Sequence, residues 1–447
     1  MVMSIFKNNN DFQRYNNIVK KIKEKISSHT GLIRITTHHD TDGLSSGAIM
    51  VKMLYRLNKE FHLSIVEYLS KDILYKLGEE CSNNDEILYI FCDMGSGQIN
   101  DILNNKLNAI ILDHHPPAIN DLELNNILQL NPHIFGINGA KEITASGVCY
   151  LIAREFGFYD LSTLAITGAI GDMQHKPFLG VNKFIINEGR KNRYIVGILK
   201  DIVYNCYDLP VWESILYSTQ PYIRELNDKN KIIDFLKKFD IDPNKTILDE
   251  KDREKLEIAL MAYANKDDII VDRYIIKHKI NDAYYLSEIL NACGREGMGS
   301  VGIGTALEDD ECIKIAKEIH IKYKKKIINE LKNTKINSLN NIEYFFGKKG
   351  TTGIIASLLV RDKPVLGIYE DGEYYKISSR GSANLVNKGL NLTEAMKIAE
   401  KYGGDGGGHN VASGGRILQT NLDDFLKNVD EIVGKQLKNK KIKIKKY

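Results

Sequence analysis

Acidic and imidazole side chains recur in four short stretches of the first 175 residues. The stretches are HHDTDG, CDMGSG, LDHHPP and GAIGDM, which begin at residues 38, 92, 112 and 168. Carboxylate oxygens with a few imidazoles suit a hard or intermediate divalent ion such as Mn²⁺ or Mg²⁺ better than a thiolate-preferring ion. The candidate residues are His38, Asp40, Asp42, Asp93, Asp113, His114, His115 and Asp172.

A single Asp after a strand is more often a helix cap or a turn former than a metal ligand. Four such clusters are harder to explain in this way. Unpaired negative charge gathered at one place would repel itself, and a bound cation relieves that repulsion.

The elements around these stretches predict how the side chains come together. Short apolar or β-branched runs end near residues 37, 93 and 113, and helical patterns follow from residue 44 and over 143–157 and 161–171. Apolar strands that alternate with helices indicate a parallel sheet covered on both faces. Such sheets bind ligands in the crevice outside the carboxyl ends of the strands. We therefore expect the acidic and imidazole side chains to meet there.

The remaining chain predicts further parts of an α/β protein. A helix is expected over 11–29, a mostly helical region over 195–290, a long amphipathic helix over 305–333, then a polar linker and strands with a hairpin turn at 370–372. We expect residues 1–195 to form a parallel-sheet catalytic domain and 196–304 a mostly helical insertion or connector. Residues 305–340 would form a connecting helix and linker, and 341–447 a smaller C-terminal α/β domain.

Composition is that of an ordinary globular protein, with 43% hydrophobic and 27% charged residues. The net charge of +3 is too small to imply a nucleic-acid partner without local clustering of Lys and Arg. The six cysteines form no CxxC pair, which argues against a zinc ribbon or a disulfide scaffold. No signal peptide and no apolar run of about 20 residues is present. We expect a cytoplasmic protein with no membrane contact.

The four stretches, in this order, resemble the motifs of the DHH phosphoesterase family. GGDGGGHNVASGG, residues 403–415, resembles the glycine-rich motif of the DHH-associated domain. Two further stretches, QLNPHIFGINGAKEITASGV and LNACGREGMG, resemble the archaeal RecJ-like, GINS-associated branch of the family. The resemblance in the first domain covers about 175 residues.

The resemblance implies a role for each candidate residue. His38, Asp40 and Asp93 match the ligands of one metal ion, and Asp42, Asp93, His114 and Asp172 match those of a second. Asp113 matches an acid that orients a histidine ligand, and His115 matches a histidine that faces the scissile phosphate. His39 occupies a variable position. The implied cofactors are two divalent ions, with Mn²⁺ preferred and Mg²⁺ as the alternative, which activate water for phosphodiester hydrolysis.

The C-terminal domain offers candidate substrate-binding residues. Successive glycines allow a close approach of the backbone to an anion, although a tight turn between two strands would explain them as well. The resemblance favours substrate binding by Arg380, Gly406, Gly407, Gly408 and His409.

Two other patterns have weaker functional meaning. GMGSVG, residues 297–302, fits a dinucleotide-binding pattern, but the sequence before it predicts a helix where that motif requires a strand. The Lys-rich end of the chain is either a solvated terminus or an arm that contacts phosphates.

The leading hypothesis is a Mn²⁺-dependent, RecJ-like exonuclease that acts on single-stranded DNA or RNA in replication or repair. One alternative is a DHH phosphoesterase of the oligoribonuclease or pAp-phosphatase kind, which the helical region over 195–290 disfavours. Another alternative is a scaffold of the replication complex bound to GINS. Loss of the metal ligands would support that alternative. All of those ligands are present. Cleavage polarity, DNA or RNA preference, minimum substrate length, protein partners and oligomeric state stay open.

Overall fold

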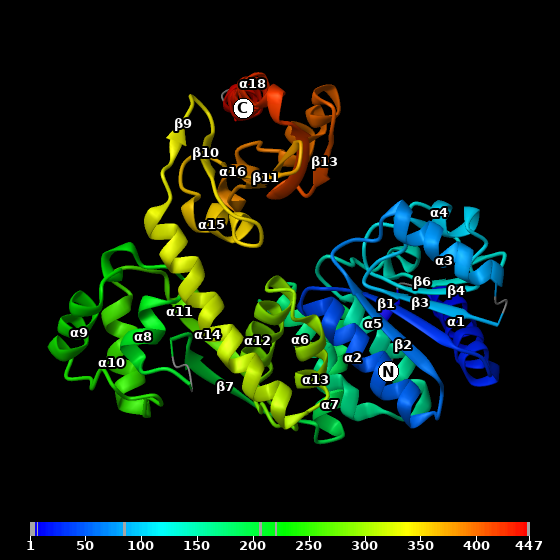
Figure 1. The fold of residues 1–447 in the computed structure, drawn as a ribbon. Helices are drawn as coiled ribbons and strands as arrows, with labels where there is room; N and C mark the ends of the chain where they lie inside the picture. Colours follow the sequence, from blue (N-terminus) through cyan, green and yellow to red (C-terminus); the bar gives the residue numbers. More distant parts are fainter. Residues whose placement is uncertain (1–4, 7, 84–85, 205–207, 220, 445–447) are drawn as a thin grey trace. The chain divides into compact units, whose positions relative to one another are not determined.

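The computed structural model describes residues 5–6, 8–83, 86–204, 208–219 and 221–444 (Figure 1). The contacts divide the chain into two compact units. The first contains Met1–Asp201 and Ile270–Ile321, and the second contains Ile202–Ile269 and Lys322–Tyr447. Among the described residues, no helix is both long and apolar enough to cross a bilayer.

The first unit is built on a sheet with the strand order β2-β1-β3-β4-β6-β5. All neighbouring strands are parallel except β5, which pairs antiparallel with β6. The three central strands are fully buried or nearly so, as expected for a parallel sheet covered on both faces. The strands are β1 (Ile33–His38), β2 (Phe61–Val66), β3 (Leu88–Cys92), β4 (Ala109–Leu112), β5 (Glu123–Leu124) and β6 (Ile127–Leu130).

Helices cover both faces of this sheet (Figure 1). The apolar sides of α3 and α4 pack on one face against side chains of β3 and β4. On the other face, α2 and α5 pack against β1, β3 and β4, and α1 packs against β6. These helices are α1 (Asn9–Ser28), α2 (Thr41–Arg56), α3 (Lys71–Asn83), α4 (Ile99–Asn104) and α5 (Ala145–Ala153). The expected parallel α/β fold is confirmed.

Further helices and a two-stranded sheet complete the first unit. They are α6 (Ser162–Gly171), α7 (Gly180–Lys191), β7 (Ile195–Ile202), β8 (Ile270–Ile276), α12 (Ala283–Arg295), α13 (Gly299–Ala306) and the start of α14 (Asp310–Asn333). The region 195–290, expected to be mostly helical, also contains the two strands β7 and β8. A helical segment separates β7 from β8, so neither shows its partner nearby in the sequence. The expected helix before GMGSVG is confirmed, because α12 ends just before it.

The second unit contains the helical segment and the C-terminal part of the chain. The helices of the segment are α8 (Val211–Leu216), α9 (Lys229–Lys238), α10 (Glu250–Leu260) and α11 (Lys266–Ile269). The unit boundaries at 201/202, 269/270 and 321/322 differ from the expected boundaries at 195/196, 304/305 and 340/341. They differ because β7, β8, α12 and α13 pack with the first unit.

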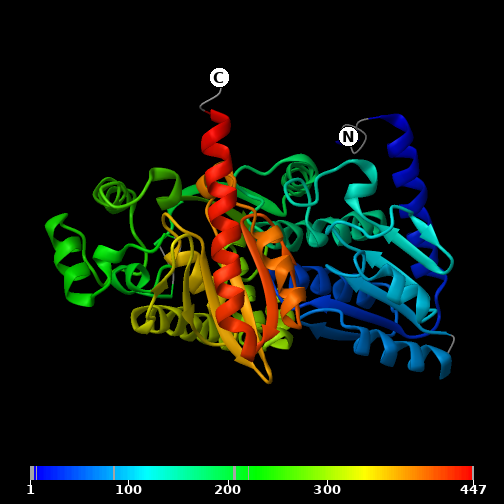
Figure 2. The ribbon, with the colours of Figure 1, turned by 90° about the horizontal axis from the view of Figure 1, so that it is seen from above.

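The C-terminal part forms a sheet with the order β13-β14-β12-β11-β10-β9. The predicted hairpin turn at 370–372 joins β11 to β12, where Asp371 pairs with Tyr374. Helix α18 lies along this sheet (Figure 2) and contributes Phe425, Val429 and Val433 to its core. The elements are β9 (Asn337–Ser338), β10 (Glu343–Phe346), α15 (Thr352–Leu359), β11 (Val365–Asp371), β12 (Tyr374–Arg380), α16 (Ala383–Asn387), α17 (Leu392–Lys397), β13 (Asp405–Gly408), β14 (Ala412–Leu418) and α18 (Leu422–Ile444).

Candidate metal centre

The first candidate ligands follow β1 and β3, which are neighbours in the sheet and end level with each other, so that His38 and Asp93 leave it side by side. His38 Nδ1 lies 3.0 Å from Asp40 Oδ2 and 3.4 Å from Asp93 Oδ2. Asp40 is also the N-cap of α2, where its Oδ1 accepts a 3.0 Å hydrogen bond from the Gly43 N–H. One carboxylate therefore caps a helix and faces the site, because its two oxygens have different partners.

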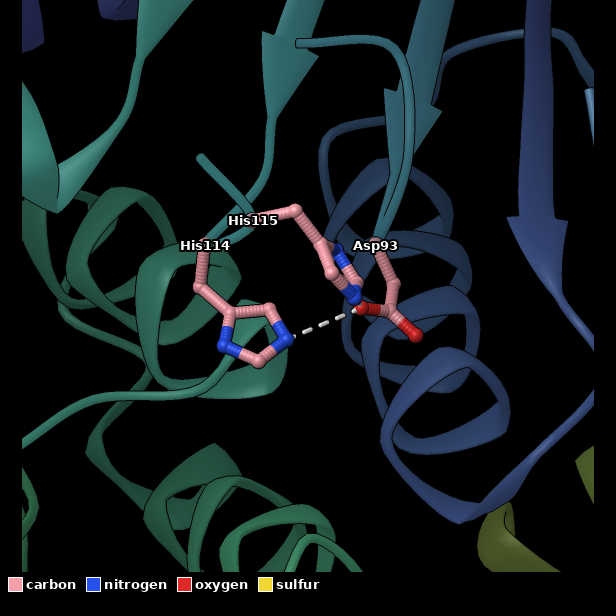
Figure 3. Close-up of side chains that lie close together, drawn as sticks. All are labelled: Asp93, His114 and His115. Carbon is pink, nitrogen blue, oxygen red and sulfur yellow. Dashed lines mark ion pairs between the residues drawn. The ribbon is translucent and has the colours of Figure 1, made fainter. Parts of the chain in front are cut away.

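The carboxylate of Asp93 lies close to both imidazoles that follow β4 (Figure 3). Its Oδ1 is 3.3 Å from His114 Nε2 and 3.7 Å from His115 Nδ1, yet it accepts no well-formed hydrogen bond from the described residues. The backbone of Asp93 has φ of +61°, a left-handed conformation that is uncommon for residues other than glycine. A buried carboxylate oxygen without a hydrogen bond is costly. Its position therefore favours a cation as partner.

Another group of three side chains forms where α2, α6 and the end of β4 meet. His114 Nε2 lies 3.4 Å from Asp172 Oδ2 and 3.8 Å from Asp42 Oδ2. Asp42 is fully buried and accepts hydrogen bonds of 2.7 and 3.0 Å from the first two N–H groups of α5. Gly168 permits the close approach of α6, because a Cβ there would lie 2.5 Å from Asp42 Oδ1.

Asp113 holds His115 and not His114. Asp113 Oδ1 accepts hydrogen bonds from the N–H groups of His114 (2.8 Å) and His115 (3.1 Å) and lies 2.8 Å from His115 Nδ1. Its Oδ2 accepts a 3.0 Å bond from the Ser96 N–H. The expectation that Asp113 orients a histidine ligand stays a prediction, and the ring that its carboxylate contacts is that of His115. The carboxylate folds back over the turn that follows it, and so it reaches the ring of His115, two residues further along.

A backbone carbonyl fixes the ring of His114. His114 Nδ1 lies 2.7 Å from the carbonyl oxygen of Gly139, which also accepts a 2.8 Å bond from Gln174 Nε2. Gln174 Oε1 in turn accepts a 2.8 Å bond from Asn182 Nδ2, and all these residues are buried. Since a carbonyl can only accept, Nδ1 is the donor and Nε2 is left to face the carboxylates. This is the arrangement that a metal-binding histidine requires.

The carboxylates raise the pKa values of the imidazoles. Burial alone would lower the pKa of His38, but Asp40 and Asp93 outweigh it and raise the value to about 11. Against the same effect of burial, Asp113 raises the pKa of His115 to about 9. The potential at this edge of the sheet is therefore strongly negative.

The residues present fit divalent cations. Burial and the Asp93 charge raise the pKa of Asp42 to about 6, and burial and the Asp42 charge raise the pKa of Asp172. Carboxylates affect one another in this way when no cation is there to neutralise them. Three sets of possible ligand atoms each lie within 4.8 Å of one another. The sets are Asp93, His114 and His115; His38, Asp40 and Asp93; and Asp42, His114 and Asp172.

Gln174 offers a test of the hydrogen bonds behind His114. The variant Gln174→Leu should weaken Mn²⁺ binding by about 10–100-fold, the range usual for loss of a group that orients a metal ligand. Calorimetric titration of MnCl₂ into the protein measures this. The matched control is Gln129→Leu, because Gln129 is also buried but donates to the carbonyls of Ile119 and Asp121. Equal Mn²⁺ affinity in both variants would contradict the orienting role.

Neither this chain of hydrogen bonds nor a role of Arg295 was predicted from the sequence. Arg295 is the exposed last residue of α12. Burial raises the pKa of Asp40, and the charges of His38 and Arg295 lower it below its usual range. His39 packs edge-on against His38, and burial lowers its pKa to about 4. Arg295 lies in the stretch LNACGREGMG, and Gln174 lies in the stretch GAIGDMQ. Neither stretch shows which distant residue its side chain will contact.

The expected substrate-binding residues lie together at one end of the second sheet. Arg380 ends β12 and pairs with Ala412 of β14, which exchanges backbone hydrogen bonds of 2.8 and 3.1 Å with His409. A Cβ on Gly406 would lie 2.1 Å from a carbonyl of α17, whereas a Cβ on Gly407 would meet nothing. Gly406 therefore serves packing, and Gly407 leaves its backbone open to a ligand.

A parallel sheet with carboxylate and imidazole clusters at its strand ends, followed by a separate mixed sheet, defines a class of two-part α/β proteins with a candidate metal centre. The model of the DHH family, N-terminal domain, matches residues 32–170, and that of the DHHA1 domain matches residues 342–435. An uncharacterized protein of Methanocaldococcus jannaschii is 58% identical over 423 residues, which cover 94% of this chain and 98% of that protein. The chain belongs to the DHH family.

Better-known proteins are more distant in sequence. The single-stranded-DNA-specific exonuclease RecJ of Thermus thermophilus is 26% identical over 168 residues, which cover 35% of this chain and 24% of that protein. Its crystal structure with Mn²⁺ matches with a TM-score of 0.58 and 18% identity over 94% of this chain and 55% of that chain. CDC45 of Entamoeba histolytica matches with a TM-score of 0.63 and 13% identity over 95% of this chain and 98% of that chain. The chain thus spans about half the length of the RecJ structure.

Proposed function

We propose that the protein is a metal-dependent exonuclease that hydrolyses phosphodiester bonds of single-stranded DNA or RNA. The observation that carries this proposal is the intact set of six candidate ligands, in which Asp93 Oδ2 lies 3.4 Å from His38, and His114 Nε2 lies 3.3 Å from Asp93 Oδ1 and 3.4 Å from Asp172 Oδ2. The crystal structure of RecJ with Mn²⁺, which shares the fold, supports the choice of metal.

Two divalent ions, preferably Mn²⁺, would be held by two overlapping sets of residues. His38, Asp40 and Asp93 would hold one ion, and Asp42, Asp93, His114 and Asp172 the other. Bound there, such ions supply charge that stabilises the phosphoryl oxygens and lower the pKa of water.

The side chains of the protein have separate tasks around these ions. Asp113 holds the His115 ring through its 2.8 Å contact with Nδ1, which leaves Nε2 to face the substrate. The side chain of His115 is 50% exposed, so that a phosphate can reach it. Asp113 raises the pKa of His115 in the metal-free protein against the effect of burial, and Nε2 of His115 would donate a hydrogen bond to a phosphoryl oxygen.

A replication scaffold is the second candidate function, and the structural similarity to CDC45 favours it. The two functions differ in their need for the six candidate ligands. A scaffold does not require buried carboxylates that raise one another's pKa. The intact cluster therefore favours catalysis, and a role beside GINS in the cytoplasm is compatible with it. A small-molecule DHH phosphoesterase would share the cluster but not the preference for long strands.

A direct assay separates these functions. Purified protein with MnCl₂ is expected to shorten an end-labelled single strand of DNA or RNA stepwise, and to cleave a dinucleotide more slowly. Faster cleavage of the dinucleotide would favour the small-molecule phosphoesterase. No hydrolysis of any of the three substrates, with Mn²⁺ bound as judged by calorimetry, would favour the scaffold.

Arg295 is expected to bind the substrate phosphates. Arg295→Ala should lower kcat/KM on a single strand by about 10-fold or more, because a charged hydrogen bond contributes roughly 1.5–3 kcal/mol. Arg295→Lys should restore part of the loss, and Mn²⁺ affinity should change little. Steady-state kinetics on a labelled single strand, with Lys183→Ala on the exposed side of α7 as control, test this. A variant with unchanged kcat/KM would remove Arg295 from the site.

A further inference from the structure

The strand β7 uses only one of its two edges within the described part of the chain. It pairs with β8 in a two-stranded sheet. Bonds from Lys277 N–H to the Tyr194 carbonyl (2.8 Å) and from Val203 N–H to the Ile269 carbonyl (2.9 Å) close the two ends of this antiparallel ribbon. Over residues 196–200, the other edge has no recorded backbone partner among the described residues.

The free edge carries apolar side chains where a protein usually places charges. Val196 is 63% exposed, Ile198 44% and Leu199 41%, and a Cβ on Gly197 between them would meet no atom within 4 Å. Natural sheets protect a free edge with charges, prolines or covering loops, because an open apolar edge pairs with other strands. Only Lys200 supplies such a charge here. These residues form what we term the β7 edge, residues 196–200.

Buried contacts with β8 and with the start of α12 hold the β7 edge in place. Arg273 of β8 is buried and reaches Asp201 Oδ2 at 2.9 Å and Asp282 Oδ2 at 2.6 Å, so that it ties both strands to the start of α12. Ile195 is buried as well. A strand that is already ordered loses little conformational entropy when it binds another, which favours association.

A group of cations lies at the start of β7. Arg190, Lys191, Arg193 and Lys277 are all exposed, and none forms an ion pair with a described residue. They are close together because α7 leads directly into β7 and because Lys277 pairs with Tyr194. We term these four residues the cationic end. A partner that carries acidic residues would be complementary in charge to the cationic end.

We propose that the β7 edge is the docking site of an extended segment from a partner protein, which adds a strand to the ribbon. Such a segment would alternate apolar residues with others and would carry acidic residues that meet the cationic end. A second copy of this chain fits less well. Antiparallel pairing of two β7 edges about Ile198 would place Val203 opposite Arg193 and bring no acid to the cationic end.

Selection from a displayed library of random peptides of about ten residues, the length of a strand, tests the proposal on the full chain. Enriched peptides should alternate apolar residues with others and contain acids. Ile198→Asp should weaken their binding by about tenfold or more in fluorescence anisotropy, and so should Arg190→Glu with Arg193→Glu. The control is Ile258→Asp, which places the same charge at a 70% exposed position of α10 and should leave binding unchanged.

In a selected peptide that pairs as a strand, every second backbone N–H faces β7. Methylation of those amides should abolish binding, and methylation of the amides between them should not. Failure to enrich any peptide, or equal binding by the Ile198→Asp and wild-type proteins, would overturn the proposal. A dimer in sedimentation that dissociates in Ile198→Asp would assign the β7 edge to a second copy instead. Loss of oligonucleotide binding in the double Glu variant, without loss of peptide binding, would assign the cationic end to nucleic acid.

Discussion

Asp93→Asn is expected to reduce Mn²⁺-dependent hydrolysis of a single strand by about 10³-fold, because removal of one group that stabilises the transition state already costs roughly 10²–10³-fold. Asp93 is a member of two of the three sets of possible ligands, so a single substitution removes a charged donor from both. The amide keeps the shape of the side chain and loses only the charge. A labelled-strand assay over a range of MnCl₂ concentrations measures the effect.

The same variant should separate loss of metal from loss of fold. After burial, the charge of Asp93 is the largest cause of the raised pKa of Asp42, and so its removal relieves repulsion in the metal-free protein. Metal-free Asp93→Asn should therefore melt at the wild-type temperature or above it, and MnCl₂ should no longer raise its Tm. The control Asp121→Asn makes the same change at an exposed position. An Asp93→Asn protein with activity within tenfold of wild type would exclude Asp93 as a ligand.

Asp42 is expected to contribute less stability to the metal-free protein as the pH rises from about 5 to 8. The pKa of Asp42 is raised to about 6 from an ordinary value near 3.9, so the folded state holds a proton that the unfolded state releases. The resulting stabilisation is complete below about pH 4 and is lost as the pH rises through 6. It amounts to roughly 2–3 kcal/mol, because one pKa unit corresponds to about 1.4 kcal/mol.

The imidazoles whose pKa is raised, His38 and His115, act in the same direction at higher pH, whereas His39, whose pKa is lowered to about 4, adds stability as the pH rises to about 6.5. His115 has a pKa of about 9 in the folded protein, so its contribution is complete below about pH 6.5 and is lost as the pH rises through 9. Cations compete with these protons, and so the stabilisation by saturating MnCl₂ should grow with pH. Urea unfolding at pH 5, 6.5 and 8, with EDTA or with MnCl₂, measures both trends. Asp42→Asn should remove the Asp42 contribution in EDTA between pH 5 and 6.5, and a variant whose stability changes over that range as the wild-type stability does would contradict it.

Most of the candidate site could be predicted because its residues follow strands. A parallel sheet brings the carboxyl ends of neighbouring strands to one edge, so His38, Asp93 and His114 meet wherever β1, β3 and β4 are adjacent. Asp40 shows why the two interpretations of an acid after a strand are not exclusive. One of its oxygens caps α2, and the other faces His38.

The supporting hydrogen bonds could not be predicted, because they join loops that are far apart in sequence. His114 meets Gly139, Gln174 and Asn182 only after the loop behind β6 and the turn behind α6 are packed together. The ring that Asp113 contacts could not be predicted for a related reason. Its spacing from His114 and His115 is similar, and only the turn decides which ring it reaches.

The strands β7 and β8 were missed because pairing is a property of two segments. Each is short, and the helical residues between them dominate any local pattern. The exposed apolar side chains of β7 also lack the alternation that marks a half-buried strand. A search for strands that considers one segment at a time therefore passes over an edge strand of this kind.

The chain passes between its two units three times, at 201/202, 269/270 and 321/322. The first two passages are the hydrogen-bonded ends of β7 and β8, and the third lies within the continuous helix α14. After a single cut of the backbone at any of these places, one segment of each unit is still covalently joined to a segment of the other. The two units therefore do not follow one another along the chain. A truncation at one boundary leaves a strand without its partner or cuts through a helix.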